Sequence, residues 1–307
     1  MTDQRGPRPL SRLMAGAMAL GLGVALAPAA ALAETSVERA ARTRELSLGV
    51  YGNIPPYVQS TAGGGLEGYA IDVAGLIAEE VSDYLGVPVK VVSEESEDSE
   101  KLFRQVHYGA IDLMCGAQFT WERQMFVDFS VPFALSGIRL LTRTEAIDGT
   151  AASLVGKRIG VIGGSLGEAT VKALQPSARI TPVATFAAGI EALRAGRLDA
   201  IAGDSILLGS AADGAGFSDA ALVPTVAYNR YAVGCITPEN NSTLRNLVNL
   251  AIAKMIQGYI NEEPRYRTLV NRWLGPESTV GLPEEAITLY FQSVMLNYEQ
   301  IGVPTSP

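Results

Sequence analysis

Residues 110–133, AIDLMCGAQFTWERQMFVDFSVPF, set an apolar run, a glycine, a helix start and an arginine in one short unit. The run 110–115 predicts a strand of a parallel sheet covered on both faces. Gly116 then lets the chain turn, and Thr120 caps a helix whose free N–H groups face the region above the strand. Arg123 in the first turn can hold a carboxylate through two parallel hydrogen bonds. The stretch therefore predicts a carboxylate receptor, and the alternative is that Arg123 is a solvated helix arginine.

The composition and charge limit the class of protein. The chain has 307 residues, 48% of them hydrophobic and 18% charged, which is the balance of a folded globular protein. Its formal net charge is −8, and removing residues 1–33, which carry three arginines and one aspartate, makes it −10. This acidic balance argues against nucleic acid as a partner. The single histidine, His107, has no partner near it in sequence, and we expect no metal and no cofactor.

The N-terminus has the features of a secretory signal peptide. Three arginines precede an apolar segment, residues 13–26, and Ala31-Leu32-Ala33 fits an A-x-A cleavage site. We therefore expect residues 1–33 to be removed and the mature chain to begin at Glu34 in the periplasm. The alternative is a single membrane anchor, but the apolar segment is short and a proline follows it.

Two segments repeat the order helix, glycine turn, strand. The first passes through Gly109 toward the strand that precedes Arg123, and the second passes through Gly196 to a strand that Asp204 follows. Ligands of open α/β sheets bind beyond the carboxyl ends of the strands, so two such sheets facing each other form one cleft. The repeat predicts a hinged, two-lobed binding protein.

The motif from Gly116 to Arg123, followed by Val127-Asp128-Phe129-Ser130 and Pro132-Phe133, resembles family 3 of the bacterial extracellular solute-binding proteins. These are polar amino-acid receptors of ABC importers, with the pattern Gly-x-Thr-x-Thr-x-x-Arg and then Asp-Phe-Ser-x-Pro-Tyr or Phe. The resemblance extends from about Leu46 to Trp273. It implies an α/β fold of the periplasmic-binding-protein type II, with two α/β lobes joined by two hinge strands and a ligand cleft between them.

The resemblance also implies a division of the chain. Lobe 1 is expected to be discontinuous, from residues 34–138 and 237–307, and lobe 2 with the hinge strands to comprise residues 139–236. The part of lobe 1 after residue 282 adds an apolar-striped helix beyond the usual end of the family. This helix either covers lobe 1 or docks a partner.

The resemblance implies a ligand site made from both lobes. Arg123 would bind the ligand carboxylate and Asp204 its ammonium, while the alternative for Asp204 is a helix cap. Backbone and hydroxyl contacts to the carboxylate would come from a loop after the strand 158–162. The expected ligand-binding residues are Arg123, Asp204, Gly116, Gln118, Ser165, Leu166, Tyr51 and Tyr57.

The two cysteines, Cys115 and Cys235, are either bridged or two buried free thiols. The resemblance favours a disulfide, because some glutamate and aspartate receptors of the family carry cysteines at both positions. Such a bond would tie the strand that carries Cys235, which is expected to return from lobe 2 to lobe 1, to the wall of the site.

Three departures from the family pattern bear on the ligand. Tyr51 stands where relatives often have a charged or amide residue, Gln118 replaces a threonine or serine, and Ile162 occupies a position that is often polar. Together with Tyr57 and Trp121 they indicate an apolar or aromatic pocket, and the alternative for these aromatics is a role at the surface or in the core. Cys115 and Cys235, with Arg139-Leu140-Leu141-Thr142, instead resemble the glutamate/aspartate branch.

The resemblance predicts a periplasmic receptor, not an enzyme, that captures an amino acid or related small carboxylate by lobe closure and presents it to an inner-membrane ABC permease. We expect it to act as a monomer. One alternative is an enzyme of the same fold, similar to cyclohexadienyl dehydratase, with Glu168 and Glu122 as candidate acids or bases. Another is a soluble ligand sensor for a membrane protein.

Overall fold

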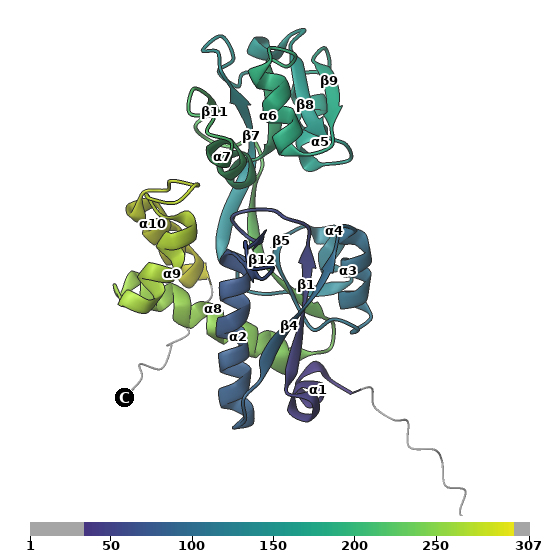
Figure 1. Ribbon diagram of the computed structural model, residues 1–307, viewed down its shortest axis with the longest axis vertical. Helices are drawn as coiled ribbons and strands as arrows, with labels where there is room; N and C mark the ends of the chain where they lie inside the picture. Colours follow the sequence, from purple (N-terminus) through teal and green to yellow (C-terminus); the bar gives the residue numbers. More distant parts are fainter. Residues whose placement is uncertain (1–33, 298–307) are drawn as a thin grey trace, which may run out of the picture. The chain divides into compact units, whose positions relative to one another are not determined.

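The computed structural model describes residues 34–297 (Figure 1). The expected signal peptide, residues 1–33, lies outside the described residues, and so does the chain from residue 298 onward. Among the helices within residues 34–297, none combines the length and apolar character needed to span a membrane.

The first lobe is built on the strands β4, β1 and β5. β1 pairs in parallel with β4 over seven residues, and a parallel bridge between Leu48 and Leu113 joins β1 to the segment that enters β5. A short hairpin, β2 and β3, follows β1. The elements up to this point are α1 (Ser36–Thr43), β1 (Glu45–Tyr51), β2 (Gln59–Ser60), β3 (Leu66–Glu67), α2 (Tyr69–Leu85), β4 (Lys90–Ser96), α3 (Ser99–His107), β5 (Met114–Gln118), α4 (Trp121–Gln124) and β6 (Val127–Phe129).

Two long strands, β7 (Ala134–Thr142) and β12 (Arg230–Pro238), connect the lobes (Figure 1). They pair with each other in antiparallel fashion. β12 also pairs with β5 and β6 of the first lobe, whereas β7 pairs with β10 and β11 of the second. The sheet therefore runs through both lobes in the order β5-β12-β7-β10-β8-β9. The lobe boundaries at residues 138 and 236 remain predictions.

The second lobe alternates strands and helices. β10 and β9 lie on either side of β8 and are parallel to it. Alternate residues of its strands face two separate apolar layers, since Leu140 belongs to the same apolar cluster as Val171 of α5, whereas Leu141 belongs to the cluster that contains Ile190 of α6. Its elements are η1 (Ala152–Leu154), β8 (Arg158–Ile162), α5 (Leu166–Leu174), β9 (Arg179–Val183), α6 (Phe186–Arg194), β10 (Ala200–Asp204), α7 (Ser205–Gly214) and β11 (Ala221–Val223).

Three helices end the described chain: α8 (Ser242–Ile260), α9 (Pro264–Leu274) and α10 (Glu284–Asn297). α8 packs against α2, and α10 packs against α8. The buried face of α10 carries Ile287, Phe291 and Val294, which join the largest apolar cluster of the first lobe. The hydroxyl of Tyr290 donates to the carbonyl of Ala134 at 2.9 Å. The C-terminal helix therefore covers the first lobe.

The predicted strand at residues 110–115 is wrong in its bounds. β5 begins at Met114 and continues through Gly116 to Gln118. Cys115 and Ala117 pair with two consecutive residues of β12, so Gly116, at φ 89°, is the additional residue of a β-bulge. The turn expected at Gly116 is absent from β5 because the bulge accommodates the glycine and the antiparallel pairing continues past it.

Helix α2 begins at Tyr69, four residues before the start that an N-cap at Asp72 would give it. Its N-cap is Gly68 at φ 146°, where a Cβ atom would lie only 2.1 Å from the carbonyl oxygen of Tyr57. The Asp72 carboxylate instead accepts a hydrogen bond from Trp273 Nε1 at 2.6 Å. Asp72 therefore makes a tertiary contact with α9 and does not cap α2.

Candidate ligand-binding site

Arg123 lies in the single turn of α4, directly after β5. Thr120 caps this turn, because its hydroxyl accepts the backbone N–H of Arg123 at 3.2 Å, which confirms the predicted cap. The half-buried guanidinium donates through Nη1 to the carbonyl of Gln118 at 3.3 Å. None of the ion pairs within residues 34–297 includes Arg123. Arg123 can therefore supply donors to an anion at the end of β5.

Asp204 ends β10 and caps α7. Its Oδ1 accepts the backbone N–H groups of Ile206 and Leu207 at 2.9 and 3.0 Å, so the helix-cap role is present. The residue is only 6% exposed. A buried carboxylate is costly unless it is hydrogen-bonded or paired, and these two bonds with the N-terminus of α7 meet part of that cost.

The other carboxylate oxygen contacts a residue that the sequence analysis missed. Tyr231 of β12 donates its hydroxyl to Asp204 Oδ2 at 2.5 Å, and it accepts Gln118 Nε2 at 3.0 Å. β7 lies between the two strands, with Ser136 opposite Tyr231 and Ile138 opposite Asp204. Residues opposite each other share a face, and so do residues two apart, so Tyr231 and Asp204 project from one face of the sheet.

Gln118 lies on the same face for the same reason. It pairs with Val233, which is two residues from Tyr231 along β12. Its amide therefore reaches Tyr231, while its backbone carbonyl accepts the hydrogen bond from Arg123. Gln118 is the residue that links the predicted anion site with the predicted cation site.

Tyr57 brings a second phenol to this region. The side chain is 3% exposed and lies against Gly116, where a Cβ atom would be 3.6 Å from the Tyr57 ring. Its hydroxyl is buried without a hydrogen-bond partner among the described residues. Burial, together with the nearby negative charge of Asp204, raises the pKa of Tyr57, and the same two causes raise the pKa of Tyr231. Both phenols therefore stay protonated at neutral pH.

Ser165 and Leu166 lie at the carboxyl end of β8, beside β10. Ser165 caps α5 by accepting the backbone N–H of Glu168 at 3.2 Å, and Leu166 is the exposed first residue of that helix. The helix packs closely on β10, because a Cβ atom at Gly167 would lie 2.9 Å from the carbonyl oxygen of Ala202. Ser165 and Leu166 therefore lie at the same strand edge as Asp204, as expected for parallel neighbours.

Glu168 is held as a carboxylate. Lys172 bonds to it at 2.7 Å and the backbone N–H of Gly164 donates to it at 2.7 Å. These two contacts, the lysine first, hold its pKa below the usual range. A glutamate with a lowered pKa is poorly suited to act as a general acid at neutral pH.

Tyr51 has a different environment. It ends β1 and packs against an apolar cluster that contains Leu102, Val106 and Ala117. Trp121 is 73% exposed on α4. The structure thus brings Arg123, Gln118 and Asp204 together through hydrogen bonds that include Tyr231, and it shows Tyr51 in apolar contacts.

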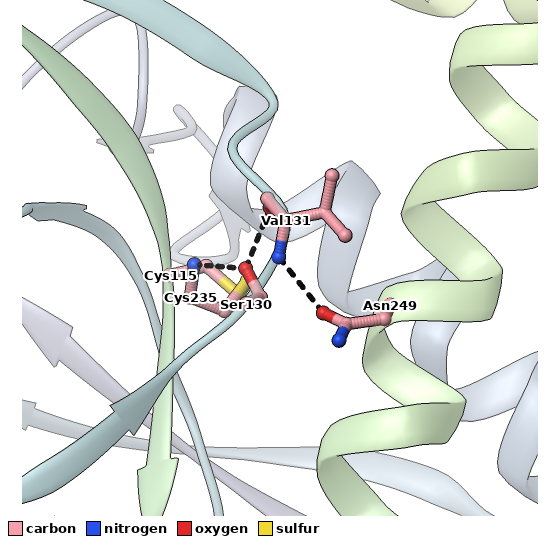
Figure 2. The surroundings of a disulfide bond; sticks show 5 residues. All are labelled: Cys115, Ser130, Val131, Cys235 and Asn249. Carbon is pink, nitrogen blue, oxygen red and sulfur yellow. Dashed lines mark hydrogen bonds between the residues drawn. A yellow bond between two sulfur atoms is a disulfide. The ribbon is translucent and has the colours of Figure 1, made fainter. Parts of the chain in front are cut away.

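Cys115 and Cys235 form a disulfide between directly paired residues of β5 and β12 (Figure 2). Ser130 lies beside it, since its hydroxyl accepts the backbone N–H of Cys235 at 2.9 Å and donates to the carbonyl of Val131 at 2.8 Å. The N–H of Val131 in turn donates to Asn249 of α8 at 2.8 Å (Figure 2). The bond thus fixes the strand that carries Gln118 to the strand that carries Tyr231.

A hollow of about 270 Å³ lies near the other face of β12, lined by Phe119, Gln124, Phe129, Ser130, Pro132, Ala232 and Gly234. Ala232 and Gly234 alternate with Tyr231 along the strand, so their side of β12 is opposite to the one that meets Asp204. A second hollow of about 270 Å³ lies in the second lobe, where α7, Phe217 and Leu222 of β11 contribute to its lining. Within residues 34–297, no group of three or more His, Cys, Asp or Glu side chains is placed to hold a metal ion.

These features define a two-lobed α/β binding protein. Its two candidate charged residues, Arg123 and Asp204, lie near the strands β7 and β12 that connect the lobes. Residues 46–276 match the model of the bacterial extracellular solute-binding proteins, family 3, and the chain belongs to this family. The match confirms the family and the fold that the motif around Arg123 predicted.

Relatives and solved structures agree with this assignment. The chain is 28% identical over 248 residues to the L-arginine-binding protein of Pseudomonas aeruginosa, covering 75% of this chain and 89% of that protein. It is 26% identical over 280 residues to the L-cystine-binding protein TcyJ of Escherichia coli, covering 89% and 97%. The ancestral amino acid-binding protein AncCDT-1, a precursor of cyclohexadienyl dehydratase, shares the fold with a TM-score of 0.65 at 21% identity, over 78% of this chain and all of that one.

Proposed function

We propose that this protein is a periplasmic receptor that captures an α-amino acid between its lobes and presents it to an inner-membrane ABC permease. The similar proteins that bind L-arginine and L-cystine support an amino acid as the ligand class. In this proposal Arg123 and the backbone at Ser165 and Leu166 bind the carboxylate, and Asp204 binds the ammonium.

One observation carries the proposal: Asp204 is a nearly buried carboxylate with no lysine or arginine paired to it within residues 34–297. A ligand ammonium would supply the missing positive charge. Arg123, which also has no ion pair in that part of the chain, is connected to Asp204 only through Gln118 and Tyr231. Arg123 and Asp204 thus carry charges opposite to the carboxylate and the ammonium of an amino acid.

The test is a thermal-shift screen of the mature chain, after unfolding and refolding have removed carried-over ligand. The probes are the L-amino acids and their carboxylate analogues. A ligand that binds only the folded protein adds about 2.7 kcal/mol to its stability at a concentration 100 times its Kd, so a true ligand raises the unfolding midpoint. If no amino acid raises the midpoint, the proposed function is wrong.

Arg123→Ala tests the anion site. We expect it to weaken binding of the identified amino acid by about 2 to 5 kcal/mol, because it leaves a desolvated ligand carboxylate unpaired. Calorimetric titration gives the affinity, and Arg104→Ala is the matched control, since Arg104 is exposed on α3 of the same lobe. Equal affinities for the two variants would remove Arg123 from the site.

The enzyme alternative draws on the likeness to AncCDT-1, a precursor of cyclohexadienyl dehydratase. Elimination would need a group that gives or takes a proton in the cleft. Lys172 and the backbone N–H of Gly164 keep Glu168 ionised by lowering its pKa, so Glu168 is poorly suited to donate the proton as a general acid. Product formation from prephenate or arogenate by the pure protein would favour the enzyme over the receptor.

A further inference from the structure

Few hydrogen-bond acceptor positions on the Asp204 carboxylate remain free for a ligand. An ionised carboxylate offers about four acceptor positions, two on each oxygen. Oδ1 already accepts two backbone N–H groups, from Ile206 and Leu207, and Oδ2 accepts the hydroxyl of Tyr231. One acceptor position on Oδ2 is therefore left for an incoming N–H group.

The hydroxyl of Tyr231 decides where that remaining position points. Tyr231 is 9% exposed, and its hydroxyl is held from the other side by Gln118 Nε2 at 3.0 Å. The Tyr231 hydroxyl accepts a hydrogen bond from Gln118, so its own hydrogen must point to another acceptor. That acceptor is Asp204 Oδ2, 2.5 Å from the Tyr231 oxygen. The carboxylate thus has a fixed orientation, set by two backbone donors and one phenol.

The same chain of bonds reaches the anion site. Arg123 donates to the carbonyl of Gln118, Gln118 donates from its amide to Tyr231, and Tyr231 donates to Asp204. Gln118 and Tyr231 lie on one face of the sheet and on strands that the Cys115–Cys235 disulfide fixes together. The spacing between the positive and the negative site is therefore held by these two residues.

We propose that Tyr231, held by Gln118, is the positioning residue that lets this protein select α-amino acids over carboxylates that lack the amino group. The inference rests on the proposed function, because it assigns Tyr231 to the ammonium side of that site. Tyr231 acts through Asp204: it orients Oδ2 so that its last acceptor position receives the ligand ammonium. Without the phenol, Oδ2 and the Gln118 amide both lose a partner, and the carboxylate is free to turn.

The experiment compares each amino acid with the acid of the same shape that lacks the amino group. The pairs are L-glutamate with glutarate, L-glutamine with glutaramate, and L-phenylalanine with hydrocinnamate, and the pair used is the one whose amino acid binds the native protein most tightly. Calorimetric titration gives the ratio of the two dissociation constants for native protein, Tyr231→Phe and the control Tyr228→Phe. Tyr228 is a matched control because its hydroxyl donates to the carbonyl of Gly149 and not to Asp204.

We expect Tyr231→Phe to weaken amino-acid binding by about tenfold or more and to change binding of the des-amino acid by less than about twofold. Tyr228→Phe should leave the ratio unchanged. If Tyr231→Phe weakens both ligands equally, its role is structural and the inference is overturned. Unchanged or tighter amino-acid binding also overturns it, the latter because Tyr231 would then compete with the ligand for Asp204.

A second variant keeps the inference testable if Tyr231→Phe does not fold. Gln118→Met changes a half-buried side chain and removes the amide that holds the Tyr231 hydroxyl. The same selective loss for the amino acid supports the inference, and an equal loss for both ligands overturns it. If the native protein binds no amino acid at all, the proposed function fails first and the inference fails with it.

Discussion

At the scale of single residues, the hydroxyl of Tyr57 is a buried polar group that no described residue hydrogen-bonds. Its ring packs beside Gly116 and edge-on to Phe133, with centroids 6.5 Å apart, and its hydroxyl is buried without a partner among the described residues. A buried hydroxyl without a hydrogen bond lowers stability because its bonds to water are lost on folding. Such a group, next to Asp204, is consistent with a site in which a ligand supplies the partner.

Tyr57→Phe should therefore raise the free energy of unfolding of the ligand-free protein by about 1 kcal/mol, because it removes an unpaired buried hydroxyl. Urea denaturation of the ligand-free protein measures the change. Tyr69→Phe is the control: Tyr69 is equally buried, but its hydroxyl donates to the carbonyl of Phe133 at 3.1 Å. We expect that control to lose about 1 kcal/mol. If both variants lose stability alike, Tyr57 has a hydrogen-bond partner in solution.

The sequence predicted part of the structure around the candidate site, because that part depends on residues close together in the chain. The Thr120 cap and the position of Arg123 in the first turn depend on residues three apart, and the cap at Asp204 depends on the two residues after it. Tyr231 depends instead on β7 lying between β12 and β10. No spacing along the chain reveals that pairing, so the sequence does not predict that Tyr231 contacts Asp204.

At the scale of elements, local sequence patterns predict the bounds of a strand or helix correctly only where its tertiary contacts agree with them. β8 has the bounds that its apolar run predicts, Arg158–Ile162, since parallel neighbours cover it on both sides. β5 was placed too early, because a glycine that reads as a turn can equally be a bulge in a paired strand. α10 was predicted from its apolar stripe, and its packing on α8 follows from that stripe.

The stripe on α10 gives a prediction for the C-terminal helix. Phe291 is fully buried and meets the Tyr259 ring edge-on at 5.3 Å, whereas Leu289, two residues away, is 67% exposed. Phe291→Ala should lower the free energy of unfolding by about 3 to 5 kcal/mol through lost burial and a cavity. Leu289→Ala should change it by less than about 0.5 kcal/mol. Chemical denaturation of both variants measures this, and a small effect at Phe291 would mean that α10 does not pack on α8 in solution.

At the scale of the molecule, buried and half-buried phenols link stability to pH. Burial is the leading cause of a raised pKa for Tyr57, Tyr69, Tyr231 and Tyr290, and for Tyr228 it raises the pKa to about 12. A neutral phenol is the form that the folded protein favours. The resulting stability is fully present below the unfolded pKa of about 10, and it is lost as the pH rises through the folded values.

The free energy of unfolding should therefore fall from about pH 10 upward. Each fully buried tyrosine should lower it by about 1.4 kcal/mol per pH unit over the range in which that tyrosine is ionised only in the unfolded chain. Guanidinium denaturation at a series of pH values between 8 and about 11.5 measures the slope. Tyr69→Phe should reduce the slope by one tyrosine's share, because it removes a fully buried phenol. Tyr108→Phe should leave it unchanged, because Tyr108 is 78% exposed. A flat profile would mean that these phenols have the same pKa in the folded and the unfolded protein, and the proposed link between their burial and stability would be wrong.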